Sequence, residues 1–539
     1  MNNLTAAMDQ IENCIATGLS HVRKQCDQEG KLNVGLLDDY QQVTSDLAVS
    51  TAEIQCARNY LEYADAKGDI EHQLASTFAA ETLHNIRQRL ARFPGDYGLV
   101  NADLDKIDPS VCGNLLSASG LESLGRLIVE RQGDLGDRGL DEEKILMADT
   151  FRQFANDVVK PLAERIHRED MIIPDEILDG VRELGCFGLS VPQQYGGLLP
   201  DDEEDNLGMI VVTEELSRGS LGGAGSLITR PEIMARALIV GGTEEQKQHW
   251  LPKIAEGRPL CAIAITEPDY GSDVASMKLK ATQVDDGWVL NGAKAWSTFA
   301  GKSGVLLTLA RTDPDPAAGH RGLSLFMVEK PEYDGESFEV SQEGGGTLSG
   351  KSIPTLGYRG MHSFNLFFDD FFVPTTHMIG EGQGLGKGFY FTMRGFMGGR
   401  IQTAARACGL MQAAFDVGLS YAQDRKVFGK AVADYQLTLV KFAKMAMYLG
   451  ACRQFTYAVG RMMDDGGGQM EASLVKLLAC KLSEWTSREA MQIHGGMGYA
   501  EETDASRYWL DARVLSIFEG TEETLALKVV GRSLVEQAG

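Results

Sequence analysis

The sequence predicts a mainly helical protein with a central β region, and three observations support this fold class. The segment 40–90 has apolar residues at three- and four-residue spacing and contains no proline, which is the pattern of amphipathic helices. Short apolar alternations typical of strands lie between about Pro259 and Pro374. Helical periodicity returns at Phe389 and is broken at 464–468. A chain of 539 residues is long enough for two or three hydrophobic cores.

The N-terminal part of the chain is expected to contain three segments. Residues 1–105 form a helical extension, because helical patterns dominate them. Residues 106–140 contain Pro109, several glycines and mixed charge, a composition that predicts a linker. Helical patterns resume over 141–258, with glycine-rich breaks, and predict a helical domain.

A β domain is expected over 259–379 and a helical bundle over 380–539. The runs Trp288–Gly292 and Val305–Leu309 have the alternation of strands. The glycine-spaced loop 380–388 lacks G-x-G-x-x-G spacing and follows no βαβ pattern. We therefore exclude a Rossmann dinucleotide fold.

The bulk properties exclude several classes of partner. The formal net charge of −25 disfavours nucleic acid and anionic lipid, both of which need clustered Lys and Arg. Residues 1–5 show no signal-peptide pattern, and no apolar run approaches the ~20 residues that span a bilayer. The nine cysteines contain no C-x-x-C pair and no zinc spacing. A cytoplasmic protein with reduced thiols, no structural metal and no membrane insertion is expected.

An internal similarity links the extension to the C-terminal bundle. Asp39-Tyr40-Gln41 matches Asp434-Tyr435-Gln436, and at the same offset Arg58 matches Arg453. The extension is therefore either a degenerate copy of the bundle or an alanine-rich helical stretch that aligns by chance.

From about Asp141 to its end, the chain resembles acyl-CoA dehydrogenases. The resemblance implies an N-terminal helical domain, a central β-barrel-like domain and a C-terminal four-helix bundle, with the extension outside the common pattern. Any one matching block is a moderate signal, but together and in the family's order they are strong. The blocks are 242–247, 265–273, 291–296, 368–374, 425–429, 492–499 and 516–523.

The resemblance implies FAD as cofactor and α,β-desaturation of an acyl-CoA as the reaction. Glu519 matches the carboxylate that removes the α-proton while flavin N5 takes the β-hydrogen as hydride. The Glu519 backbone N–H, next to Gly520, would donate to the thioester oxygen, a contribution often worth ~3–4 kcal/mol per donor. Some relatives carry the base on an earlier helix, where this chain has Gly399, which cannot serve.

The same resemblance implies the residues that bind FAD. Hydroxyl and backbone N–H groups suit the flavin edge and phosphates, an aromatic plane packs on the ring system, and an Arg fork suits a diphosphate. The family often has Ile-Thr-Asn after the Trp and Gln at the position of Glu523, so this chain departs from the pattern there. The set is Ile263, Ile265, Thr266, Gly271, Ser272, Trp296, Ser297, Thr298, Arg425, Phe428, Gln436, Gln492, Gly495, Gly496, Thr521 and Glu523.

The expected substrate is a short branched acyl-CoA with a second carboxylate. A buried carboxylate needs a cation, and Arg230 lies where most relatives have apolar residues at the end of the acyl pocket. It is the candidate clamp; the alternatives are that it caps a turn or pairs with Glu232. Ser272, Arg400 and Gly520 complete the expected substrate contacts, Arg400 through the CoA moiety.

The resemblance also implies partners and leaves alternatives open. Relatives are commonly tetramers, but an extension that mimics the bundle would favour a homodimer with FAD bound across the subunit interface. Electron-transferring flavoprotein is the expected acceptor, whereas an acyl-CoA oxidase or flavin monooxygenase would use oxygen. A flavin-bearing binding protein of the DNA-alkylation-response type is disfavoured by the intact Glu519 run and the net charge of −25. A purely structural helical scaffold leaves the flavin-lining blocks unexplained.

Overall fold

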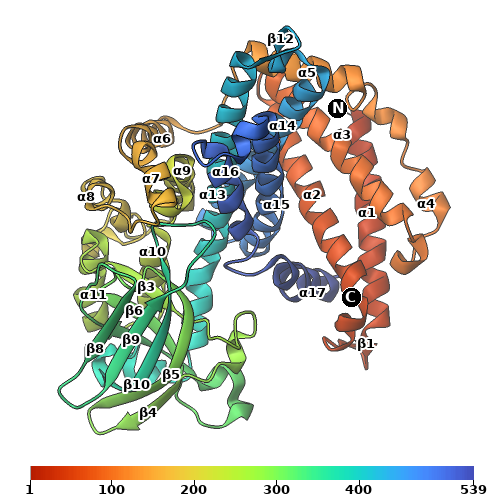
Figure 1. The fold of residues 1–539 in the computed structure, drawn as a ribbon. Coiled ribbons are helices and arrows are strands. Elements are labelled where there is room, and N and C mark those ends of the chain that lie inside the picture. The colour runs from red at the N-terminus through yellow and green to blue at the C-terminus, as the bar shows by residue number, and fades with distance from the viewer. Residues whose placement is uncertain (1) are drawn as a thin grey trace. The chain divides into compact units, whose positions relative to one another are not determined.

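The computed structural model describes residues 2–539 and divides into two compact units. One unit joins residues 1–146 to residues 403–539, and the other contains residues 147–402. Each unit is described by itself below, and Figure 1 gives the element labels.

The first unit is helical and combines the extension with the C-terminal bundle. Two short ribbons interrupt the helices, β1 (Asp27–Gln28) with β2 (Lys31–Leu32) and β11 (Lys426–Val427) with β12 (Lys430–Ala431). The helices are α1 (Asn2–Gln25), α2 (Gln41–Asp65), α3 (Asp69–Ala91), α4 (Asn101–Asp105), α5 (Ala118–Glu130), α6 (Glu142–Phe154, continuing into the second unit), α13 (Gly388–Asp424, beginning in the second unit), α14 (Gln436–Asp464), α15 (Gln469–Ile493), α16 (Asp504–Leu515) and α17 (Arg532–Gln537).

The extension packs against the bundle and shares its hydrophobic core, and it is not a separate domain. Helices α2, α3 and α5 pack against α14, and α2 also packs against α15. Tyr448 of α14 donates to the buried Glu81 of α3 at 2.6 Å, and Lys444 forms an ion pair with the same carboxylate. Residues 106–140, expected as a linker, contain the whole of α5. Gly125 allows this helix close approach, because a Cβ there would lie 2.0 Å from the carbonyl oxygen of Leu439.

The order of elements repeats between the extension and the bundle. A long helix, a two-residue ribbon, a 3-10 turn and two long helices occur in both: α1 to α3, and α13 to α15. Tyr40 and Tyr435 each precede the first residue of the middle helix. The ribbon turns match in backbone, with φ of 54° and 79° at Glu29 and Gly30 and 48° and 84° at Phe428 and Gly429. A left-handed pair is the usual backbone of a two-residue hairpin turn, so the structural support for the repeat hypothesis comes from the shared order of elements.

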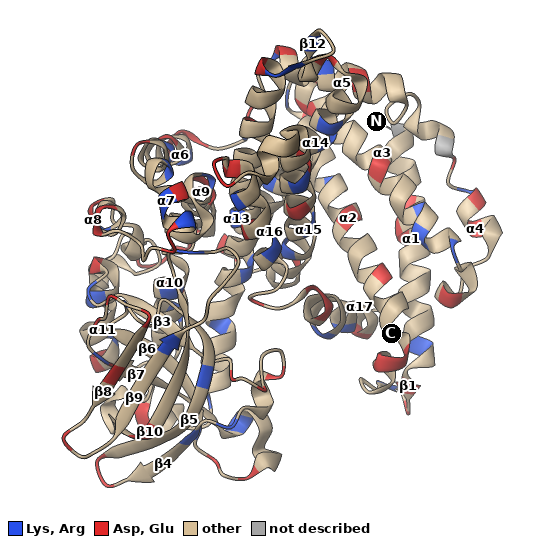
Figure 2. Ribbon diagram, in the orientation of Figure 1, with Lys and Arg blue, Asp and Glu red and all other residues tan. Residues whose placement is uncertain are grey.

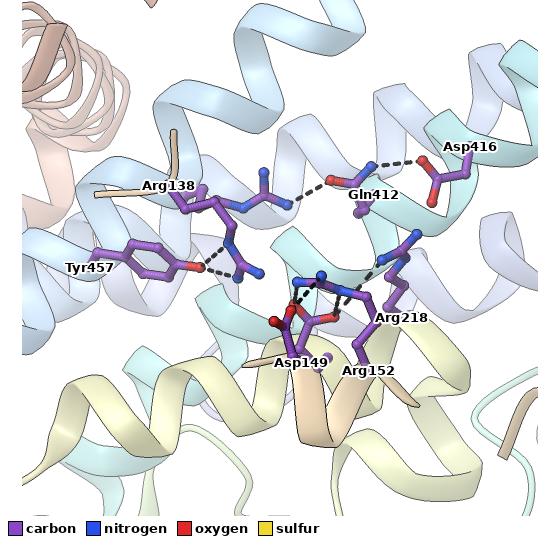
Figure 3. A network of polar contacts seen from close by, with 9 residues as sticks. Arg138, Asp149, Arg152, Arg218, Gln412, Asp416 and Tyr457 are labelled. Atoms are coloured by element: carbon purple, nitrogen blue, oxygen red, sulfur yellow. Dashed lines mark hydrogen bonds and ion pairs between the residues drawn. The ribbon is translucent and has the colours of Figure 1, made fainter. Parts of the chain in front are cut away.

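The matched arginines of the repeat have matching roles. Arg58 of α2 binds Glu12 of α1, and Arg453 of α14 donates to Gln412 of α13 at 2.8 Å. Figure 3 shows Gln412 bonded in turn to Asp416 on the same helix, at 2.7 Å. In both halves an arginine on the middle helix therefore ties that helix to the one before it.

The second unit contains helices and one curled sheet. Its sheet has the order β3-β6-β4-β5-β10-β9-β8, with β7 paired to β6. The expected strands 288–292 and 305–309 are confirmed, within β5 and β6. Its helices are α7 (Lys160–Arg168), α8 (Asp175–Glu183), α9 (Asn206–Gly219), α10 (Thr229–Gly241), α11 (Glu244–Glu256) and α12 (Glu381–Gly384), and its strands are β3 (Cys261–Ala264), β4 (Lys280–Val284), β5 (Gly287–Thr298), β6 (Val305–Arg311), β7 (Leu323–Glu329), β8 (Ser337–Ser341), β9 (Thr347–Ser352) and β10 (Ser363–Pro374).

The sheet is two-sided, and its alternating side chains build two cores. Leu307, Leu309 and Leu325 pack with the apolar faces of α10 and α11. Leu306 and Phe326 point to the other side and pack with the aromatic residues of β10. Period-two alternation assigns these neighbours to opposite faces.

Charge is distributed over both units. Figure 2 shows basic and acidic residues interspersed along the helices. Many form ion pairs between helices, such as Arg89 with Glu53 at 2.8 Å and Arg152 with Glu215 at 2.8 Å. Within residues 2–539, no helix is both long and apolar enough to cross a membrane.

Substitution of Gly125 by alanine tests the close contact of α5 with α14. The added methyl group would overlap a backbone carbonyl, so the two helices must separate. We expect a loss of about 1–3 kcal/mol in the free energy of unfolding, measured by denaturant titration. Ser123→Ala, at an exposed position of the same helix, is the matched control. Unfolding of Gly125→Ala that matches the control would contradict this packing.

Candidate active site

Glu519 lies in the loop between α16 and a π-helical turn, Thr524–Gly531. Its backbone is left-handed, with φ of 54°, and Gly520 follows with φ of 101°. The side chain is only 13% exposed and ion-pairs with Arg406 at 3.2 Å. Thr403, one turn earlier on α13, donates to the second carboxylate oxygen at 2.5 Å. The carboxylate is therefore held against α13 and is not turned to solvent.

A buried lysine holds the backbone of this loop. Lys476 of α15 donates to the carbonyl oxygens of Phe518 at 2.9 Å and Gly520 at 2.5 Å, on either side of Glu519. A left-handed conformation is unfavourable for a residue with a side chain and persists only where its surroundings impose it. The ammonium group supplies that constraint.

In the second unit, the end of β3 lies beside the end of β5. The Ala295 N–H donates to the Thr266 carbonyl at 2.8 Å, which joins the two blocks that are expected to line the flavin. Next to Thr266, Glu267 accepts from the N–H groups of Lys278 and Leu279, each at 2.7 Å. Lys294 bonds the same carboxylate at 3.0 Å, and burial lowers the pKa of this lysine. A buried ion pair thus fixes both blocks.

The residues that follow Lys294 present a ring face and hydroxyl groups. Trp296 has φ of 58° and its side chain is 57% exposed. Ser297 is buried, and its hydroxyl has no hydrogen-bond partner among the described residues. Thr298 bonds the Ser363 hydroxyl at 2.8 Å across to β10. An exposed aromatic plane beside polar groups fits a planar heterocycle such as a flavin.

The other expected contacts in this unit lie around the same strand ends. Ile263 is half-buried within β3, and Ile265 is buried just after it. Gly271 and Ser272 are exposed in the loop beyond Thr266, and Arg400 is half-buried on α13. The structure therefore brings Thr266 and the Trp296 block together.

Arg230 is buried at the start of α10, as a clamp would require. One nitrogen donates to the Ser226 carbonyl at 2.7 Å and another to the Tyr358 hydroxyl at 3.1 Å. Within residues 2–539, no carboxylate lies within ion-pair distance of this guanidinium. Pairing with Glu232 was an alternative, and it is wrong, because Glu232 pairs with Arg236 at 2.8 Å. The bond to Ser226 agrees with the other alternative, a turn cap.

Sequence reasoning missed Tyr358. Its φ of 58° is unusual for an aromatic residue. Gly222 allows the segment to approach, because a Cβ there would lie 2.3 Å from the Arg359 carbonyl oxygen.

The expected adenosine-side contacts lie in the first unit and are exposed. Phe428, at the β11–β12 turn, is 99% exposed, and Arg425 precedes the same ribbon. Gln436 is exposed at the start of α14 and bonds Glu122 of α5 at 2.7 Å. At the C-terminal end of α15, three expected contacts are exposed: Gln492, Gly495 and Gly496. A Cβ added at either glycine would meet no heavy atom within 4 Å. Thr521 caps the turn of Thr524 at 3.3 Å, and Glu523 is exposed.

Sequence reasoning also missed Arg406 and Lys476. Each is fully buried within a helix of apolar and small residues. A charged residue in such a run was the available signal, since Lys and Arg are rarely buried without a partner.

Three family models match the chain in order. The N-terminal, middle and C-terminal domains of acyl-CoA dehydrogenases match residues 141–258, 262–371 and 386–535. (2S)-methylsuccinyl-CoA dehydrogenase of Cereibacter sphaeroides is 36% identical over 98% of this chain and 97% of its own.

Solved structures of acyl-CoA dehydrogenases are similar to this chain as well. Butyryl-CoA dehydrogenase from Megasphaera elsdenii is 31% identical with a TM-score of 0.67, covering 74% of this chain and 99% of its own. A glutaryl-CoA dehydrogenase from Mycobacterium smegmatis, in complex with FADH2, is 26% identical with a TM-score of 0.65, covering 74% and 96%. The chain belongs to the acyl-CoA dehydrogenase family of oxidoreductases.

Proposed function

We propose that the protein desaturates a short, branched, dicarboxylic acyl-CoA with FAD as cofactor, converting (2S)-methylsuccinyl-CoA to mesaconyl-CoA. The observation that carries this proposal is the Glu519 carboxylate, which is largely removed from water and held by two side chains, as suits a positioned base. The relative from Cereibacter sphaeroides, which matches the extension as well as the dehydrogenase domains, supports the substrate.

The residues present fit the cofactor. The unpartnered hydroxyl of Ser297 and the exposed Trp296 ring suit the isoalloxazine, and the open glycines 495 and 496 suit close approach of a phosphate or adenosine. When bound, FAD supplies the acceptor for the β-hydride.

The chain itself handles the α-proton and the developing charge. Glu519 accepts the proton, and its own backbone N–H is the proposed donor to the thioester oxygen. The loop can do both because Lys476 fixes the Phe518 carbonyl, which belongs to the same peptide unit as that N–H, and also fixes the Gly520 carbonyl. A donor fixed in advance needs no reorganisation as charge develops.

Substitution of Glu519 by glutamine tests the base. The amide keeps the shape of the side chain but cannot accept the proton, so the rate of flavin bleaching by methylsuccinyl-CoA should fall at least about 1,000-fold. FAD content, read from the visible spectrum, should stay at the wild-type value. Normal bleaching in this variant would rule out Glu519 as the base.

Arg230 is the proposed clamp for the free carboxylate of the substrate. A guanidinium binds a carboxylate through two parallel hydrogen bonds. Two of its nitrogens are occupied by Ser226 and Tyr358, which fix the plane of the group. A buried cation of this kind, without a protein carboxylate beside it, favours an anionic ligand over an apolar one.

Arg230→Ala separates the two kinds of substrate. With a dicarboxylic acyl-CoA, kcat/KM should fall about 100-fold, since a buried charged hydrogen bond is worth about 3 kcal/mol. With a neutral branched acyl-CoA of the same length the value should change little. Equal losses on both substrates would remove the clamp and leave Arg230 as a turn cap. Steady-state kinetics on the two substrates measures the difference.

We propose a homodimer with FAD bound across the subunit interface and electron-transferring flavoprotein as acceptor. The repeat of α1 to α3 supports this, because the extension supplies within one chain a second bundle like the one through which relatives assemble into tetramers. The ribbon turn of the copy carries Cys26 and Glu29 where the bundle carries Arg425 and Phe428. The copy therefore lacks the proposed FAD-binding side chains, and one FAD per chain follows.

Light scattering coupled to size exclusion tests the assembly. A particle of twice the chain mass with one FAD per chain is expected. A tetramer, or two FAD molecules per chain, would contradict the role given to the extension.

A further inference from the structure

Among residues 2–539, Glu519 forms an ion pair with one cation, Arg406, to which the proposed reaction assigns no role. Arg406 is fully buried on α13, and its guanidinium lies 3.2 Å from Glu519 Oε1. The same guanidinium lies over the Phe518 ring, 5.2 Å from the centroid. Thr403 donates to the other oxygen of Glu519. The two donors are one turn apart on the same helix, so they meet both carboxylate oxygens from one side.

We propose that Arg406 and Thr403 are positioning residues that keep the Glu519 carboxylate ionised and aimed until substrate binds. This inference rests on the proposed role of Glu519 as base. A carboxyl group removed from water tends to become protonated, and a protonated glutamic acid cannot accept the α-proton. An adjacent cation and a hydrogen bond to the charged form oppose that tendency.

The other groups around Glu519 do not supply this charge compensation. Lys476 of α15 directs its ammonium to backbone carbonyls at 2.9 and 2.5 Å. Cys480 of the same helix is neutral, because burial raises the pKa of its thiol to about 12. Glu522, on the loop itself, carries the same charge as Glu519 and pairs with Lys481 at 3.7 Å. Arg406 is the cation that contacts the carboxylate directly.

The contacts that Arg406 and Thr403 make with Glu519 can be distinguished by experiment, because their loss has different effects. Loss of the Arg406 charge makes Glu519 easier to protonate, whereas loss of the Thr403 hydroxyl removes one neutral hydrogen bond. An opposite charge at this distance changes a titration by about 1–3 pH units, and a single neutral hydrogen bond by less.

The experiment is the pH profile of flavin bleaching by methylsuccinyl-CoA, measured by stopped flow on the FAD-loaded enzyme. In Arg406→Gln the acid limb should move upward by about one pH unit or more. Thr403→Val should move it in the same direction by less, and Arg406→Lys should return it close to wild type. If the acid limb of the pH profile is the same in Arg406→Gln as in the wild type, the proposal is wrong. If Arg406→Gln fails to load FAD, an acid limb that is unchanged in Thr403→Val would also overturn the proposal.

A second measurement does not depend on the flavin. Unfolding titrations of Arg406→Gln, Glu519→Gln and the double variant form a cycle. The double variant should be less destabilised than the sum of the single variants, because each single change leaves a buried group without its partner. Additive losses would indicate that Arg406 only supports the helix.

Failure of this inference can be told from failure of the proposed function. Glu519→Gln decides the base on its own. If it abolishes bleaching while Arg406→Gln leaves the pH profile unchanged, the base stands and the positioning role falls. If Glu519→Gln bleaches normally, both fall.

Discussion

A carboxylate buried among helices needs compensation for its charge, and the end of this chain is organised around that need. Glu519 sits on a loop with left-handed backbone, and two helices distant in sequence hold it: α13 through its side chain and α15 through the flanking carbonyls. The position of the proposed base therefore depends on the bundle and not on its own segment alone.

The second unit also contains a buried charge, but there the charge is positive. There a cation, Arg230, is buried with neutral partners from a turn and from Tyr358. Glu267 and Lys294 neutralise each other and fasten the strand ends that carry Thr266 and Trp296. The Glu267–Lys294 pair is neutralised within the protein and serves the structure. Arg230 has no such counterion among residues 2–539 and retains the capacity to bind an anion. This difference separates a fold-determining ion pair from a candidate specificity residue.

The proposed duplication of the bundle would explain how the extension can be integral to the fold without repeating its chemistry. The copy keeps what the backbone needs: the left-handed pair at Glu29 and Gly30, the tyrosine before the middle helix, and an arginine tie to the preceding helix. It has lost the side chains expected to bind cofactor. Packing constrains a repeat along its whole length, whereas ligand contacts depend on a few side chains that can change without unfolding it.

The sequence by itself determined the fold class and the family blocks, and it predicted Glu519 as the base, because periodicity and short motifs are local properties. It also indicated Arg230 as a cation at a position where most relatives have apolar residues. It did not reveal Arg406, Lys476 or Tyr358, nor that α5 lies within 106–140 and packs on α14. Those depend on which side chains meet across helices and strands far apart in the chain. Only the tertiary structure decided them, since the free energy of a buried charge depends on its neighbours in space, not in sequence.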